Sequence, residues 1–187
     1  MNTLSNSISN SASKPVNWAG VVLLSITFWL SSSLLLDFVV MPGMFISGIM
    51  SQPDFGTAGY TLFWVFNRIE LVCVALVLTG LLVNRQGRGE EAVMVSGLRS
   101  RWAMEIAVAL LGITLMLTYA LSPAMGALGI SLDAFDTSHT TPAGMNLLHG
   151  LYFGLEALKL VGCVALLKLS FQDLKVVEVP ALARIDG

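Results

Sequence analysis

Charged side chains are scarce in this sequence. Lys, Arg, Asp and Glu make up 12% of its 187 residues, whereas soluble domains carry about 25%. Hydrophobic residues reach 55% and the mean hydropathy is +0.78, so we do not expect a water-soluble globule. With a net charge of −2 and no basic cluster, the chain also lacks the positive surface that a nucleic-acid partner requires.

Residues that build catalytic centres are few as well. The sequence contains neither a Ser-His-Asp motif nor a Gly-rich phosphate loop followed by Lys-Ser or Lys-Thr. The two cysteines, Cys73 and Cys163, both lie in apolar runs, which indicates buried free thiols rather than a disulfide framework. We therefore expect no catalytic residues and no enzymatic activity.

Ligands for a metal or a haem are also sparse. Of the two histidines, His149 falls in an apolar run and His139 in a connecting loop, so two histidines are not available to hold a haem within the membrane. Several methionines lie towards the same side of the apolar runs, and thioethers with imidazole would suit copper(I). Their spacing is not diagnostic, and methionine commonly fills cores, so we expect no metal and no other cofactor.

Long apolar runs, by contrast, are abundant. A membrane-spanning helix needs about 20 mostly apolar residues, and the backbone in lipid must satisfy its own hydrogen bonds. We therefore predict an all-α integral membrane four-helix bundle, in contact with the lipid bilayer. Its four spans are expected at residues 17–40, 60–83, 102–121 and 145–169.

Polar segments flank this membrane domain, which we place at residues 17–170. Residues 1–16 are rich in Ser and Asn and lack hydrophobic bulk, so we predict a disordered tail there. Residues 171–187 are predicted to form a C-terminal tail. The first apolar run is too long for the core of a signal peptide and no clear cleavage site follows it, so we interpret it as a retained span.

The connecting segments differ sharply in charge. The two that follow the first and third spans contain no Lys or Arg and carry acidic residues instead. The positive-inside rule therefore places both termini and the middle loop in the cytoplasm of a bacterial-type inner membrane. The basic residues on that side are Lys14, Arg85, Arg88, Arg99, Arg101, Lys168 and Lys175.

The chain shows signs of an internal repeat. The first and third spans end alike, in "DFVVMPGM" at 37–44 and "TYALSPAM" at 118–125. The second and fourth spans also align, so the bundle is predicted to consist of two tandem helical hairpins. Similar composition of apolar helices is the competing explanation. We expect Pro42 and Pro123 to stop or kink their helices.

Ionisable and polar side chains inside the predicted spans mark a candidate site. A charge at the bilayer centre costs at least about 2.5–3.5 kcal/mol, so these groups should face inward and pair. We predict the ion pairs Glu156–Lys159 and Glu70–Lys159, and Arg68 with Asp37 where geometry permits. The pocket they form is predicted to open outward and to be lined by Asp37, Asn67, Glu70, His149, Tyr152, Glu156 and Lys159.

Small residues favour close packing of the spans, because they let helix backbones approach each other. The glycines expected to play this role are Gly80, Gly112, Gly154 and Gly162.

Three stretches resemble a known family. "FVVMPGMF" in the first span, "YALSPAM" in the third and "LLHGLYFGLEALKLVGCVALL" in the fourth resemble the four-helix membrane family that includes transmembrane protein 205 and its bacterial relatives of unknown function, over residues 18–170. The resemblance implies a multi-pass membrane protein and supplies no catalytic residues. The charged "FNRIE" of the second span departs from the family pattern.

Two functions remain open from the sequence. In the first, the polar pocket binds or passes a small polar solute, an ion or a proton, with His149 as the group able to titrate near neutral pH. In the second, the charges are structural and the protein is an accessory or assembly subunit of a membrane complex, or a homodimer. The aromatic side chains predicted to face lipid and to meet such a partner are Phe28, Trp29, Trp64 and Phe153.

Overall fold

A computed structural model describes residues 16–49, 52, 55–86, 90–135 and 144–182. Within these ranges the chain is helical almost throughout and has no strand. The predicted tail at 1–16 falls outside the described residues except for Val16. Lys14, Arg88 and His139 fall outside them as well.

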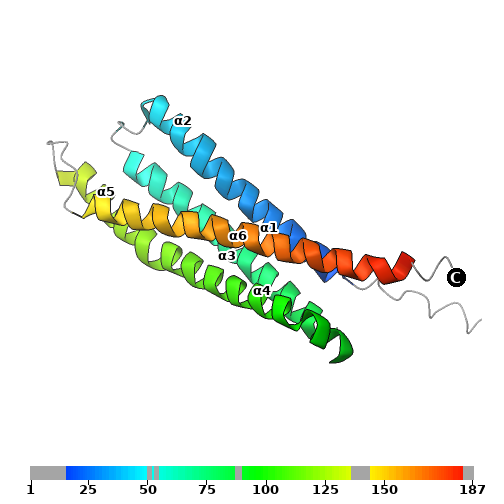
Figure 1. Ribbon diagram of the computed structural model, residues 1–187. Helices are drawn as coiled ribbons and strands as arrows, with labels where there is room; N and C mark the ends of the chain where they lie inside the picture. Colours follow the sequence, from blue (N-terminus) through cyan, green and yellow to red (C-terminus); the bar gives the residue numbers. More distant parts are fainter. Residues whose placement is uncertain (1–15, 50–51, 53–54, 87–89, 136–143, 183–187) are drawn as a thin grey trace, which may run out of the picture.

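Four helical rods make up the bundle (Figure 1). The first begins where the Asn17 side chain accepts a hydrogen bond from the Gly20 amide at 3.1 Å, which satisfies a free N–H at the helix start. The second is α3, Phe55–Gln86, and the fourth is α6, Met145–Leu182. The first and third rods are each built in three parts: α1 Trp18–Leu35, η1 Leu36–Val40 and α2 Met41–Ile46, then α4 Glu90–Met116, η3 Leu117–Leu121 and α5 Ser122–Phe135.

All four rods are long and apolar enough to cross a membrane, which confirms the predicted all-α four-helix membrane bundle. α1 begins and α6 ends at the same end of the bundle as the connection between α3 and α4 (Figure 1). The helix α6 continues to Leu182, well into the segment predicted as a tail. The candidate spans are Trp18–Ile46, Phe55–Gln86, Arg99–Leu128 and Met145–Gln172.

The segments η1 and η3 are π-helices, and each lies just before a proline. η1 ends two residues before Pro42, and η3 ends two residues before Pro123. Proline has no N–H to donate, and its ring clashes with the carbonyl four residues earlier. In a π-helix each hydrogen bond spans five residues instead of four, so the turn before the proline is wider. The helix therefore passes both prolines, and the predicted alternative that proline stops the helix is wrong.

The bundle is closed by a ring of neighbouring helices. α1 packs on α3, α3 on α4, α4 on α6 and α6 on α1. An apolar core fills the half nearest the connection between α3 and α4, and a smaller cluster of Leu117, Leu121 and Tyr152 lies towards the other end. The larger core is formed by Val22, Ile26, Trp29, Cys73, Val74, Val77, Ala103, Ala107, Leu110, Cys163 and Leu166.

Two glycines bring helices into close contact. A Cβ on Gly80 would lie 2.4 Å from Val22 Cγ2, and one on Gly162 would lie 2.8 Å from Leu110 Cδ2. Gly80 and Gly162 therefore allow close helix packing, as predicted. Gly112 and Gly154 are exposed and have open space around them, so the prediction that they also allow close packing is wrong.

Candidate functional site

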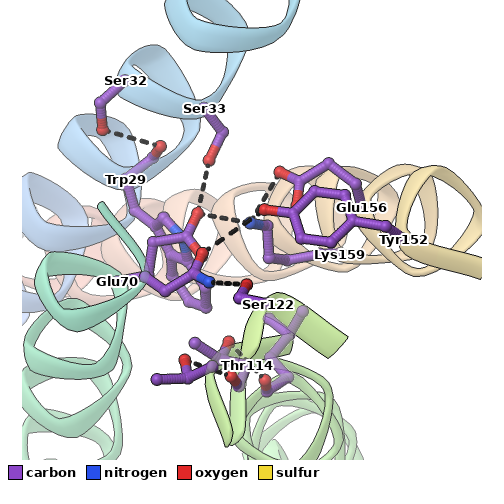
Figure 2. A network of polar contacts seen from close by, with 12 residues as sticks. Trp29, Ser32, Ser33, Glu70, Thr114, Ser122, Tyr152, Glu156 and Lys159 are labelled. Carbon is purple, nitrogen blue, oxygen red and sulfur yellow. Dashed lines mark hydrogen bonds and ion pairs between the residues drawn. The ribbon is translucent and has the colours of Figure 1, made fainter. Parts of the chain in front are cut away.

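A buried ion cluster lies between the two apolar cores. Lys159 of α6 extends towards Glu70 of α3 and Glu156 of its own helix (Figure 2). Its Nζ pairs with Glu70 Oε1, and it lies 2.6 Å from Glu156 Oε1. All three side chains are at most 5% exposed. Two of the three ion pairs predicted from the sequence, Glu70–Lys159 and Glu156–Lys159, are therefore confirmed.

The two carboxylates of the cluster are not equally supported. Ser33 of α1 donates a hydrogen bond to Glu70 Oε1 at 3.0 Å, so Glu70 accepts from both Ser33 and Lys159. Within the part of the chain that the structure describes, Glu156 accepts from Lys159 alone. The second oxygen of each carboxylate, Glu70 Oε2 and Glu156 Oε2, is buried and has no hydrogen-bond partner among the described residues.

A polar layer lies one helical turn from the cluster. Asn67 Nδ2 donates to Ser122 Oγ at 2.7 Å, and the Tyr152 hydroxyl donates to Asn67 Oδ1 over a long 3.5 Å. Asn67 precedes Glu70 by one turn of α3, and Tyr152 precedes Glu156 by one turn of α6. The layer therefore joins α3, α5 and α6 directly beside the ion cluster.

A cavity of about 400 Å³ occupies the end of the bundle that the charge pattern predicts to be outer. Tyr152 and Ser122 belong both to its wall and to the polar layer. The ring of Phe63 meets that of Tyr152 edge-on, with centroids 5.4 Å apart. Aromatic and thioether side chains dominate the wall: Phe55, Tyr60, Phe63, Tyr152, Phe153, Met41, Met125 and Met145.

Two further wall residues, Asp37 and His149, carry ionisable groups. Asp37 lies in η1, is half-buried, and makes no hydrogen bond or ion pair with any described residue. His149 is exposed, and its Nδ1 lies 3.0 Å from the carbonyl oxygen of Met145. Because a carbonyl only accepts, Nδ1 carries the hydrogen, and Nε2 of a neutral ring is free to accept.

The structure divides the predicted pocket into two parts. Asp37, His149 and Tyr152 line the cavity. The other four, which are absent from its described wall, form the polar layer and the ion cluster beneath it: Asn67, Glu70, Glu156 and Lys159.

Other sequence expectations differ from the structure. Arg68 does not pair with Asp37; it is exposed, and its guanidinium lies 3.6 Å from the centre of the Trp64 ring. Trp29, predicted to face lipid, is 1% exposed and belongs to the apolar core. Phe28, Trp64 and Phe153 are exposed as predicted, although Phe153 also borders the cavity.

Sequence analysis overlooked Ser122 and Tyr60. Ser122 directly follows η3, so a regular helical wheel drawn through the third span gives it the wrong direction. Tyr60 packs against Gly126, where a Cβ would come within 2.4 Å of its ring. In the sequence, Tyr60 near the start of the second span and Gly126 after the third are the only indication that these two spans meet closely at this wall of the cavity.

Among the residues whose positions are described, no group of three or more His, Cys, Asp or Glu side chains is arranged to hold a metal ion. Asp37 is the one carboxylate among the residues that line the cavity, and it shares the wall with aromatic rings, methionines and the imidazole of His149.

Comparison with known proteins gives one match. The sequence model of a family described as "Domain of unknown function (DUF4149)" matches residues 24–129. Glu70 lies within this region, whereas Glu156 and Lys159 lie beyond it on α6. No curated protein and no solved structure matches the chain.

Proposed function

The chain belongs to the DUF4149 family, a domain of unknown function, and we propose that this multi-pass membrane protein binds a small organic cation in its outer cavity. The ligand has an apolar body that fills the aromatic and methionine-rich wall and a charged amine that pairs with Asp37. The cavity volume of about 400 Å³ lies in the usual range for small-molecule sites, about 300–1,000 Å³.

The observation that carries this proposal is the Asp37 carboxylate. It stands in the cavity wall and makes no hydrogen bond or ion pair with any described residue. Lys159 attracts it through space, but that ammonium group already pairs with Glu70 and Glu156, and a charge within the membrane is costly. An ammonium group would neutralise it and would also be attracted by the faces of nearby rings such as Tyr60 and Phe63. A metal ion is a poorer fit because, among the described residues, no group of three or more His, Cys, Asp or Glu side chains is arranged to hold one, and His149 is the one such side chain that joins Asp37 in the cavity wall.

Binding is better supported than passage through the bundle. Beneath the cavity lie Tyr152, Asn67 and the ion cluster, and beyond these the apolar core fills the bundle between all four rods. A solute that enters from the outer end therefore meets closely packed side chains before it reaches the cytoplasmic half.

The test uses benzyltrimethylammonium and its uncharged isostere neopentylbenzene, with the purified protein in detergent and binding measured by calorimetry. We expect the cation to bind about tenfold more tightly, which corresponds to about 1.4 kcal/mol. Asp37→Asn should abolish this preference. Glu105→Gln, which removes an exposed carboxylate from α4, should keep it. Equal affinities of the unmodified protein for the two probes would contradict the proposal.

A second candidate function is that of a subunit in a larger membrane complex, and Arg68 favours it. This residue lies about 20 Å along α3 from its outer end, is exposed, and stacks on an equally exposed Trp64. An acidic residue on a partner's helix would neutralise the guanidinium at mid-membrane. Native electrophoresis of membranes in mild detergent should then show a large complex that is lost in Arg68→Leu and retained in Lys168→Leu. Migration as a single small species would argue against this function.

The closer relationship to transmembrane protein 205 and its bacterial relatives remains a prediction. It is supported by the proline-containing ends of the first and third rods and by the Leu148–His149 pair that opens α6. A structure of a member of that family should show π-helices before the equivalent prolines. Regular α-helices there would weaken the relationship.

A further inference from the structure

The ion cluster is unbalanced in charge. Glu70 and Glu156 supply two carboxylates, and Lys159 supplies one ammonium group, so full ionisation leaves one uncompensated negative charge in a buried site. Such a charge costs several kcal/mol in a protein interior. We propose that the cluster binds one exchangeable proton, carried by Glu156, which enters from the outer side through the cavity.

Hydrogen bonding identifies Glu156 as the carrier. Glu70 accepts from Ser33 and Lys159, and each donor stabilises its ionised form. Among the described residues, Glu156 accepts from Lys159 only, through Oε1. The second oxygen of each carboxylate lacks a described partner, so the Ser33 bond is what favours the ionised form of Glu70 and leaves the proton on Glu156 Oε2.

The groups around the cluster reinforce this need for a proton. Asp37 of η1 interacts with Lys159 and with both glutamates, so it competes for the single ammonium group while it repels the two carboxylates. The other titratable neighbours are Cys73 of α3 and, on α6, Tyr152 and Cys163. The buried polar residues described on α4, η3 and α5 are the hydroxyl-bearing Thr114, Thr118 and Ser122, so these elements bring no compensating positive charge.

A proton suits the site better than a metal ion. Ions such as Mg²⁺ and Ca²⁺ take six or more oxygen ligands, and the cluster has two unused carboxylate oxygens. The ammonium of Lys159 between the two acids also repels any added cation, whereas a proton forms a covalent O–H bond and needs one oxygen.

The polar layer links the proton site to the cavity. Tyr152 lines the cavity and lies one turn from Glu156, and Asn67 beside it lies one turn from Glu70. On the other side the apolar core separates the cluster from the cytoplasm. If the proposed organic cation occupies the cavity, it and the proton repel each other, and each lowers the affinity for the other by the same factor. This coupling rests on the proposed function, whereas the proton site does not.

Infrared spectroscopy of the ligand-free protein in lipid nanodiscs tests the proposal. Near pH 7, where a glutamate in water is ionised, we expect the C=O stretching band of one protonated carboxyl group, which shifts when the protein is transferred to D₂O. Glu156→Gln should abolish the band. Glu70→Gln should abolish it too, because Glu156 and Lys159 then balance. Glu105→Gln should leave it unchanged.

Four results would overturn the proposal. The unmodified protein could lack the band, or both glutamine variants could retain it. Loss of the band in Asp37→Asn would assign the proton to the cavity wall instead. A band that is present at low ionic strength and is lost when NaCl is added would show that the cluster takes Na⁺. All these measurements use protein without a cavity ligand, so they are independent of whether an organic cation binds.

The route of entry is tested by filling the cavity. In Met125→Trp the larger side chain occupies the wall next to Tyr60 and Tyr152, away from the ion cluster. We expect a carboxyl band of the same size whose shift in D₂O is at least about tenfold slower. Exchange at the original rate, with the band intact, would show that the proton enters by another path.

Discussion

Of the buried residues that the structure describes, Lys159 is the one that carries a positive charge. Its long side chain is 1% exposed and holds together acids from two helices. A buried ion pair is a modest source of stability in itself, but the loss of one partner leaves the other charge uncompensated. The contribution of Lys159 to the free energy of unfolding can therefore be measured by replacing Lys159 while both glutamates are kept.

We predict that Lys159→Met lowers the free energy of unfolding by about 3–5 kcal/mol, because Glu70 and Glu156 then face each other without a cation. Unfolding in detergent measures the effect. The triple variant with Glu70→Gln and Glu156→Gln should recover most of the loss. Lys168→Met, on the exposed side of the same helix, should change stability by no more than about 0.5 kcal/mol. An unchanged stability of Lys159→Met would contradict the assignment.

Hydrogen-bond lengths in the polar layer predict an order of effects. Ser122→Ala removes the acceptor 2.7 Å from the buried Asn67 amide and should cost about 1–3 kcal/mol. Tyr152→Phe removes a contact of 3.5 Å and should cost less than about 1 kcal/mol, because the ring keeps its packing against Phe63. Chemical unfolding of the two variants side by side checks this, and the reverse order would contradict it.

At the scale of single elements, the straightness of a helix decides how well sequence locates a site. In α3 and α6 a regular turn holds throughout the membrane, so the helical wheel placed Glu70, Glu156 and Lys159 on facing sides. In the first and third rods the π-helices shift the register. Asp37 lies inside one and Ser122 directly after the other. The pairing of Asp37 with Arg68 was predicted from their opposite charges alone, and Ser122 was not predicted to face the site.

Helix packing at glycine gives an element-scale prediction. In Gly80→Ala the new Cβ would lie 2.4 Å from Val22 Cγ2 and 3.4 Å from the Trp18 carbonyl oxygen. Valine is stiff about χ1, so α1 must shift on α3 at a cost of about 1–3 kcal/mol.

Gly112→Ala is the matched control, because the space around Gly112 is open. We expect it to lose no stability, since alanine favours helix over glycine. Thermal unfolding of both variants in the same detergent provides the comparison. Equal stabilities would show that α1 and α3 are not in close contact at Gly80.

For the whole molecule, the sequence identified the number of spans because hydropathy alone determines it. The division of the predicted pocket into a cavity and a buried ion cluster was harder to predict. Hydropathy and helical wheels show which side chains face inward, but they do not give their relative depth. His149 borders the cavity, whereas Glu156 is packed beneath it. This difference follows from three-dimensional packing and could not be predicted from the sequence.

The orientation of the bundle remains a prediction that fusion reporters can test. Alkaline phosphatase fused after Gln86 or after Leu182 should be inactive, because the positive-inside rule places both sites in the cytoplasm. Fused after Ile49 or Gly144, it should be active. A fluorescent protein that folds only in the cytoplasm should give the opposite pattern. Equal alkaline phosphatase activity at all four fusion sites would contradict four spans.

The apolar core of the half near the α3–α4 connection seals the bundle behind the ion cluster. The side chains of this core are almost all apolar and give a chain of water few hydrogen-bond partners. We therefore expect that vesicles containing the protein hold an imposed proton gradient as long as empty vesicles do.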